Sequence, residues 1–219
     1  MKTKVKVCCI KSREEAQLAI RYGASALGFV SAMPSGPGPI SEDQIAAIIP
    51  FVPPGIASFL LTSQTNAAAI VRQQQETKAN TLQLVDAVPS SVYSELRAAL
   101  PGVTIVQVIH ITGAESLEEA KAVAPLVDAL LLDSGNPNLP VKELGGTGRV
   151  HDWTLSKTIR QHVTVPVYLA GGLRPENVAE AIRFVRPYAV DLCSGVRTNG
   201  NLDEAKLAAF FSQVTAAHS

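Results

Sequence analysis

The feature that most constrains the fold is a regular alternation of short apolar segments and longer amphipathic segments, which repeats eight times. Short apolar runs predict buried strands, and apolar residues spaced three to four apart predict helices. The predicted strands are residues 5–10, 26–30, 56–61, 81–85, 104–109, 129–132, 165–169 and 189–193. The predicted helices are residues 12–22, 41–49, 66–76, 89–100, 115–124, 155–162, 175–185 and 202–217.

Strict alternation of strands and helices favours parallel strand pairing in an α/β fold. Eight such units in 219 residues fit a closed (β/α)8 TIM barrel that occupies residues 1–219 as a single domain. The alternative is an open doubly wound sheet, which usually stops at five or six strands. No Gly-x-Gly-x-x-Gly follows the first predicted strand, so the sequence favours the barrel.

Charge and cysteine content narrow the range of partners. Nineteen basic residues balance nineteen acidic ones, so we expect no nucleic acid partner. The apolar runs are far shorter than the roughly 18 residues of a membrane-spanning helix, and no signal peptide is recognisable at the start. Three cysteines form neither a disulfide framework nor a Cys-x-x-Cys metal motif, and we expect a soluble cytoplasmic protein.

Two strand ends carry residues suited to acid–base chemistry, and active sites of barrels lie at these ends. Cys8 and Cys9 end the first strand, where alternation predicts that one side chain points inward and the other outward. A buried cysteine can equally be a small inert apolar residue. Asp133 directly follows a buried apolar run. It is either a general acid or base with a raised pKa, or a helix cap or ion-pair partner.

Glycines follow the seventh and eighth strands, where many barrels bind phosphate. Gly171 and Gly172 end one strand, and Ser194 and Gly195 end the next. Their backbone N–H groups could approach an anion, although tight turns alone would also explain glycine there. The loop that contains residues 145–149 is glycine-rich, which predicts a mobile lid. Asp152 is predicted to cap the helix that follows.

Taken in order, motifs along nearly the whole chain resemble the phosphoribosylanthranilate isomerase family of tryptophan biosynthesis. The motifs are Val-Lys-Val-Cys at 5–8, Ala-Leu-Gly-Phe-Val at 26–30, Leu-Gln-Leu at 82–84, Leu-Leu-Asp-Ser at 131–134, Gly-Gly-Thr-Gly-Arg at 145–149 with Asp-Trp at 152–153, Leu-Ala-Gly-Gly-Leu at 169–173 with Pro-Glu-Asn-Val at 175–178, and Ser-Gly-Val at 194–196.

The resemblance implies an Amadori rearrangement of a small phosphorylated sugar-amine, without a metal or an organic cofactor, in a monomer or a homodimer. Cys8 would be the general base and Asp133 the general acid. For Cys8 to have thiolate character, Lys6 or the dipole of the strand end is the expected cause. The resemblance places the phosphate on Gly171, Gly172, Ser194 and Gly195, and it places Gln83 among the substrate-binding residues.

The chain also departs from the family pattern on the substrate side. The family usually has glycine at Cys9, histidine at Val85 and glutamate at Arg197, and a Ser-x-Arg where this chain has Ser-Gly-Pro-Gly-Pro at 35–39. Our hypothesis is that Arg197 supplies the missing positive charge to the anthranilate carboxylate. The alternatives are a barrel enzyme acting on another phosphoribosyl amine, or a non-catalytic phosphosugar-binding protein.

A third cysteine is expected near the site. Cys193 ends the eighth strand, which lies beside the first strand in a closed barrel. Cys8 and Cys193 could therefore approach each other, and we interpret this as packing, with redox control as the alternative.

Overall fold

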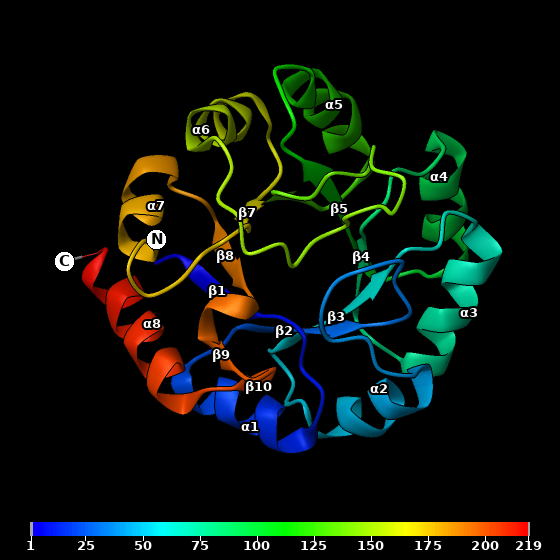
Figure 1. Ribbon diagram of the computed structural model, residues 1–219. Coiled ribbons are helices and arrows are strands. Elements are labelled where there is room, and N and C mark those ends of the chain that lie inside the picture. The colour runs from blue at the N-terminus through cyan, green and yellow to red at the C-terminus, as the bar shows by residue number, and fades with distance from the viewer. Residues whose placement is uncertain (1, 219) are drawn as a thin grey trace.

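Eight parallel strands close into a barrel, and the closure is made where β1 pairs with β8. The computed structural model describes residues 2–218. The barrel strands are β1 (Lys4–Val7), β2 (Ala26–Val30), β3 (Ala57–Thr62), β4 (Thr81–Leu84), β5 (Thr104–His110), β6 (Ala129–Asp133), β7 (Val167–Leu169) and β8 (Ala189–Leu192). The predicted (β/α)8 TIM barrel is confirmed (Figure 1).

Helices surround the strands in a ring (Figure 1). They are α1 (Arg13–Tyr22), α2 (Glu42–Ile48), α3 (Ala67–Thr77), α4 (Ser90–Ala99), α5 (Glu115–Val123), α6 (Trp153–His162), α7 (Val178–Val185) and α8 (Glu204–Ala216). Short 3-10 helices are η1 (Ile49–Phe51), η2 (Ala124–Leu126) and η3 (Ser194–Val196), and β9 (Arg197–Thr198) pairs with β10 (Asn201–Leu202) in a small hairpin. Within residues 2–218, no helix has the length and apolar character needed to cross a bilayer.

Side chains at the helix ends fix several boundaries. Ser12 caps α1, and Asp152 caps α6 as predicted, because each side-chain oxygen accepts a hydrogen bond from a free N–H in the first turn. Two predicted helices start too early. Asn177 ties the turn before α7 to Gly172 and Arg174, so that helix begins at Val178. Asp203 caps α8, which begins at Glu204.

The alternation of side chains along each strand produces two apolar cores. Outward residues such as Leu82, Leu130 and Val190 pack against the helices. Inward residues such as Phe59, Val106 and Leu131 fill the barrel. Because a barrel interior of this size is packed with side chains, a ligand has room only at the mouth, where the loops after the strands rise above the core.

A long loop between β6 and α6, residues 134–152, covers the carboxyl-terminal mouth of the barrel (Figure 1). The Ser35 hydroxyl donates to the carbonyl of Lys142 at 2.6 Å, and Lys142 pairs with Asp86 at 2.5 Å. These contacts tie the loop to the segments that follow β2 and β4. The predicted lid therefore lies over the mouth, and its mobility stays a prediction.

Candidate active site

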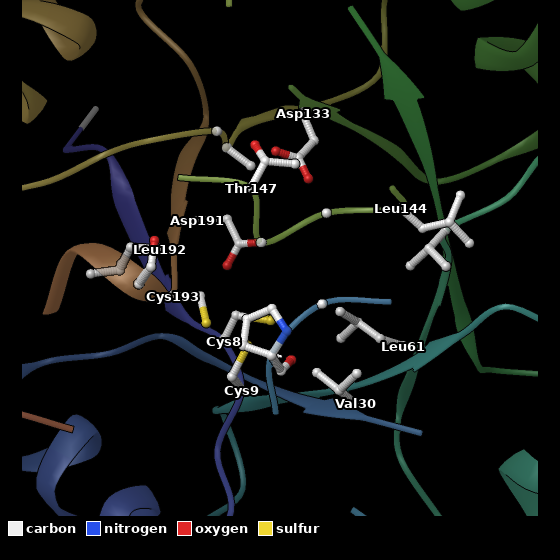
Figure 2. A pocket seen from close by; sticks show the side chains of 18 of the residues that line it. Cys8, Cys9, Val30, Leu61, Asp133, Leu144, Thr147, Asp191, Leu192 and Cys193 are labelled. Atoms are coloured by element: carbon white, nitrogen blue, oxygen red, sulfur yellow. Dashed lines mark hydrogen bonds between the residues drawn. The ribbon is translucent and has the colours of Figure 1, made fainter. Parts of the chain in front are cut away.

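A cavity opens at the carboxyl-terminal end of the barrel, beneath the loop of residues 134–152. Cys8 from the end of β1 and Asp133 from the end of β6 both line it (Figure 2). Gly171, Gly172 and Ser194 line it from the loops after β7 and β8. Residues predicted separately to handle protons and phosphate thus meet in one cavity.

The first strand ends earlier than predicted, and this changes the direction of its last side chains. β1 stops at Val7, and Cys9 has a left-handed backbone with φ of +63°. Both Cys8 and Cys9 line the cavity, so the expectation that one points inward and the other outward is wrong. Alternation holds only in an extended strand, and the left-handed turn breaks it. Cys193 joins them, so three free thiols gather on one side of the cavity (Figure 2).

A buried ion pair lies among the inward side chains of β1 and β8. The strand register places Lys6 opposite Asp191, and Lys6 Nζ is 2.8 Å from Asp191 Oδ2. Lys6 is 0% exposed and also lies over the ring of Phe59. Burial alone would lower the pKa of Lys6, but Asp191 and the thiols of Cys8 and Cys9 more than offset it, so the ammonium group stays charged.

The environment of Cys8 favours its thiolate. A hydrogen bond from the side chain of Cys9 lowers the pKa of Cys8, burial opposes this effect, and the charge of Lys6 supports it, with a net downward direction. The pKa of Cys9 is raised well above its ordinary value, chiefly by its side-chain contacts with Cys193 and Cys8 and by burial. Cys9 therefore keeps its proton beside Cys8, and the charge of Lys6 acts on Cys8 in the predicted direction.

The environment of Asp133 favours the neutral carboxylic acid. Burial raises the pKa of Asp133, against the N–H of Ser134, which donates to Oδ1 at 2.8 Å, and against the charges of His110 and Lys6. The side chain is 7% exposed. A carboxyl group with a raised pKa holds its proton to higher pH and can deliver it, which is the property a general acid needs.

The loops after β7 and β8 form a cradle of glycine backbone. Gly171 and Gly172 have φ of +82° and +62°, and a Cβ on Gly172 would lie 2.6 Å from the backbone of Arg149. Within residues 2–218, no protein group accepts a hydrogen bond from the N–H of either glycine. A Cβ on Gly195 would lie 2.1 Å from the carbonyl oxygen of Leu173, so the two loops touch through their backbones. Free N–H groups on such a turn can bind a phosphate.

The opposite wall of the cavity is apolar. It is formed by Val30, Met33, Leu61, Val85 and Leu144. Figure 2 shows three of them, Val30, Leu61 and Leu144, facing the cavity away from Asp191. This wall provides an apolar surface that suits an aromatic ring.

The amide side chain of Gln83 lines this cavity from β4. Gln83 is 4% exposed, and its Oε1 atom has no hydrogen-bond partner among residues 2–218. A buried polar atom without a partner is costly unless a ligand provides one. No Arg or Lys side chain is among the residues found to line the cavity in the described part of the chain.

Arg197 does not line the cavity, so the predicted contact with a substrate carboxylate does not fit this geometry. Its guanidinium is 2.8 Å from Glu15 and donates to the carbonyls of Cys8 and Cys9 at 3.2 and 2.5 Å. Arg197 is the first residue of β9, directly after η3, and its side chain contacts the backbone that follows β1. The sequence analysis did not identify Asp191, which lines the cavity and pairs with Lys6.

No group of three or more metal-ligating side chains is found within residues 2–218.

Sequence comparisons agree over almost the full chain. Residues 5–213 match the sequence profile of the family described as N-(5'-phosphoribosyl)anthranilate (PRA) isomerase. The N-(5'-phosphoribosyl)anthranilate isomerase of Methanosarcina acetivorans is 37% identical over 98% of this chain and 94% of its own length. Isomerase 1 of Methanosarcina mazei is 34% identical over 100% of this chain and 97% of its own.

Solved structures give the same result. Phosphoribosyl anthranilate isomerase from Thermus thermophilus superposes with a TM-score of 0.83 and 28% identity, covering 98% of this chain and 99% of its own. A phosphoribosyl anthranilate isomerase in complex with reduced 1-(o-carboxyphenylamino)-1-deoxyribulose 5-phosphate superposes with a TM-score of 0.80 and 26% identity, with the same coverage.

Proposed function

The chain belongs to the N-(5'-phosphoribosyl)anthranilate isomerase family, and from this premise we propose that Cys8 and Asp133 are the proton-transferring residues of its reaction. The protein is an isomerase of tryptophan biosynthesis. It converts N-(5'-phosphoribosyl)anthranilate to the corresponding 1-deoxyribulose phosphate by an Amadori rearrangement. The roles of Cys8 and Asp133 are assigned from their surroundings in the cavity.

In the first step, Asp133 donates its proton to the ring oxygen of the ribose. The C1–O bond breaks, the nitrogen lone pair forms an iminium ion at C1, and the ring oxygen becomes a hydroxyl group. Burial of Asp133, which favours the protonated carboxyl group, supports this role.

In the second step, the thiolate of Cys8 removes the proton from C2. The electron pair of the C2–H bond forms the C1–C2 double bond, and the iminium nitrogen becomes neutral. The resulting enolamine tautomerises to the ketone. The lowered pKa of Cys8 supports this role, because the charged thiolate is the basic form.

The rest of the cavity orients the substrate between these two groups. Backbone N–H groups of Gly171, Gly172, Ser194 and Gly195 would bind the phosphate, as the positive φ angles of the two β7 glycines and the contact between the loops support. Gln83 would hydrogen-bond the substrate through its unpartnered amide oxygen. The apolar wall would receive the aromatic ring.

The protein acts as a monomer or a homodimer, and both monomeric and dimeric forms occur among its structural relatives. We place the protein in the cytoplasm, where a small phosphorylated sugar-amine would be its partner. The equal numbers of acidic and basic residues support the absence of a nucleic acid partner.

The observation that carries the proposal is that Cys8 and Asp133, with pKa values displaced in opposite directions, line the same cavity. The test is a fluorescence assay of phosphoribosylanthranilate consumption by the wild type, Cys8→Ser and Asp133→Asn. We expect each variant to lose about 10²–10⁴-fold in kcat. Asp128→Asn is the matched control and should retain activity, because Asp128 immediately precedes β6, at the opposite end of the strand from Asp133.

A folded wild-type protein without turnover would contradict catalysis and favour a phosphosugar-binding protein. Full activity in either variant would contradict the role of that residue.

A further inference from the structure

Both terminal nitrogens of Arg197 make hydrogen bonds outside the cavity, whereas its buried Nε has no partner among residues 2–218. Nη1 contacts Glu15 Oε1 at 2.8 Å and the carbonyl of Gly200 at 3.1 Å. Nη2 contacts the carbonyls of Cys8 and Cys9 and Glu15 Oε2. The residue is 9% exposed, so these contacts are shielded from water.

Glu15 anchors the guanidinium from the other side. Its carboxylate also accepts hydrogen bonds from the N–H of Lys11 and of Leu202, at 3.0 and 2.9 Å. The carboxylate thereby joins the loop after β1, the first turn of α1 and the hairpin of β9 and β10. The partners of Arg197 lie in α1, in the turn of the hairpin at Gly200 and in the segment after β1. Because these segments are separate in the chain, Arg197 is held in one position relative to the end of β1.

The contact with both cysteine carbonyls constrains Cys9 directly. The Cys8 carbonyl belongs to the peptide before Cys9, and the Cys9 carbonyl belongs to the peptide after it. The angle between these peptides is set by φ and ψ of Cys9, whose φ is +63°. Residues other than glycine rarely adopt this conformation, and it persists only where the surroundings impose it. A single nitrogen bound to both carbonyls provides such a constraint.

We propose that Arg197 is a positioning residue for the catalytic thiol, because it holds the left-handed turn at Cys9 that keeps Cys8 and Cys9 facing the same cavity. The proposal rests on the proposed role of Cys8 as general base. Arg197 does not touch the substrate in this arrangement. It acts through the backbone of the two residues that carry the thiols.

The turn determines the surroundings of the Cys8 sulfur. The titratable and charged groups that act on it are Cys9, Lys6 from β1 and Asp191 from β8, while Asp133 from β6 and Cys193 line the same cavity. The charge of the Arg197 guanidinium also acts on the thiols of Cys9 and Cys193. In the turn, the Cys9 thiol donates to the Pro37 carbonyl at 3.6 Å and lies beside Cys8, whose pKa it lowers. If the turn relaxes to an extended backbone, the Cys9 thiol leaves both positions. The Cys8 thiolate then becomes less stable, and a smaller fraction of the enzyme holds the base in its active form.

The test compares Arg197→Met with Glu15→Gln and with Arg97→Met, a control in which the lost ion pair, with Asp128, lies away from the cavity. The first measurement is the rate of Cys8 alkylation by iodoacetamide as a function of pH, followed by mass spectrometry of the Cys8 peptide. The second is the pH dependence of kcat and KM for phosphoribosylanthranilate. Alkylation reports the thiol without requiring turnover.

For Arg197→Met we expect the alkylation midpoint to move up by about one pH unit and kcat at a pH below that midpoint to fall about tenfold, because there each unit reduces the thiolate fraction about tenfold. KM should change less than about twofold, since no substrate contact is lost. Glu15→Gln should show the same changes more weakly, and Arg97→Met should show none. A KM increase with unchanged kcat, or an unchanged alkylation profile, would overturn the proposal.

A second comparison keeps the proposal testable if Arg197→Met is poorly folded. Glycine adopts the left-handed turn without strain. In a Cys9→Gly background, Arg197→Met should therefore lower kcat by less than about threefold, relative to Cys9→Gly alone. An equal loss in both backgrounds would show a general structural role and contradict positioning. Loss of turnover with a normal alkylation profile in Asp133→Asn would leave the proposal intact, whereas full turnover in Cys8→Ser would remove the premise on which it rests.

Discussion

The backbone of Gly145 lies directly against the carboxyl group of Asp133: a Cβ built on Gly145 would stand 2.9 Å from Asp133 Oδ2. The covering loop therefore approaches the proposed general acid so closely that a side chain has no room. Gly145 also has φ of +144°, a conformation that residues with a side chain rarely adopt.

Gly145→Ala should lower kcat about tenfold, because a strained backbone costs on the order of 1–3 kcal/mol and the loop would be displaced from Asp133. Steady-state kinetics provide the measurement. Gly102→Ala is the control, since Gly102 has φ of +84° but no atom within 4 Å of its Cβ position. That variant should lose stability and keep its kcat. Equal kinetic losses at both positions would contradict a specific contact between Gly145 and Asp133.

The pH dependence of kcat/KM should be bell-shaped, with limbs closer together than the ordinary values of 3.8 for Asp and 9.0 for Cys. The active enzyme needs a protonated Asp133 and a deprotonated Cys8. The pKa of Asp133 is raised and that of Cys8 is lowered, and each unit by which they converge increases the active fraction about tenfold. Rates measured from pH 4 to 10 test this. Limbs at or outside the ordinary values would contradict the assigned environments.

Lys6→Met should destabilise the protein by about 3–5 kcal/mol, because it leaves Asp191 buried without its charged partner. The double variant Lys6→Met with Asp191→Asn should recover much of this loss, since no unpaired charge remains. Urea denaturation monitored by circular dichroism provides both free energies. Equal destabilisation in the single and double variants would indicate that the lysine contributes through packing alone.

The enzyme should discriminate only moderately against an amine that lacks the carboxylate. No Arg or Lys side chain is found lining the cavity within residues 2–218, so hydrogen bonds alone remain to recognise that group. A hydrogen bond to a charged group contributes about 1.5–3 kcal/mol, and we expect the phosphoribosyl derivative of aniline to retain kcat/KM within about a hundredfold of the anthranilate compound. A thousandfold or larger preference for the carboxylate would contradict this prediction.

The sequence predicted the barrel well because its signals are local. Apolar runs, helix caps such as Ser12 and Asp152, and glycines after the strands each report on their own segment. The early end of β1 was not predictable in this way. The left-handed conformation of Cys9 is imposed by Arg197, 188 residues further along the chain. Nothing in the neighbouring residues signals it.

Asp133 could be predicted as a site residue because its own strand end shows the signal, a carboxylate directly after a buried apolar run. Arg197 was misplaced because its direction depends on a hairpin that periodicity does not reveal, β9 with β10. Asp191 could have been found. It stands between Val190 and Leu192 on a buried strand, and barrel closure brings that strand beside Lys6, so a charge pair was available from the strand pattern alone.

The two sides of the cavity come from separate parts of the barrel. The ends of strands β6, β7, β8 and β1 and the loops after them carry the proposed acid, the phosphate cradle and the proposed base. Residues of β2 and β3, and of the segments that follow β2 and β4, form most of the apolar wall. Substitutions on the wall can therefore change which amine is accepted without disturbing proton transfer at the sugar. A barrel divided in this way is a natural starting scaffold for directed evolution toward new phosphoribosyl amines, with a library confined to the segments that follow β2, β3 and β4.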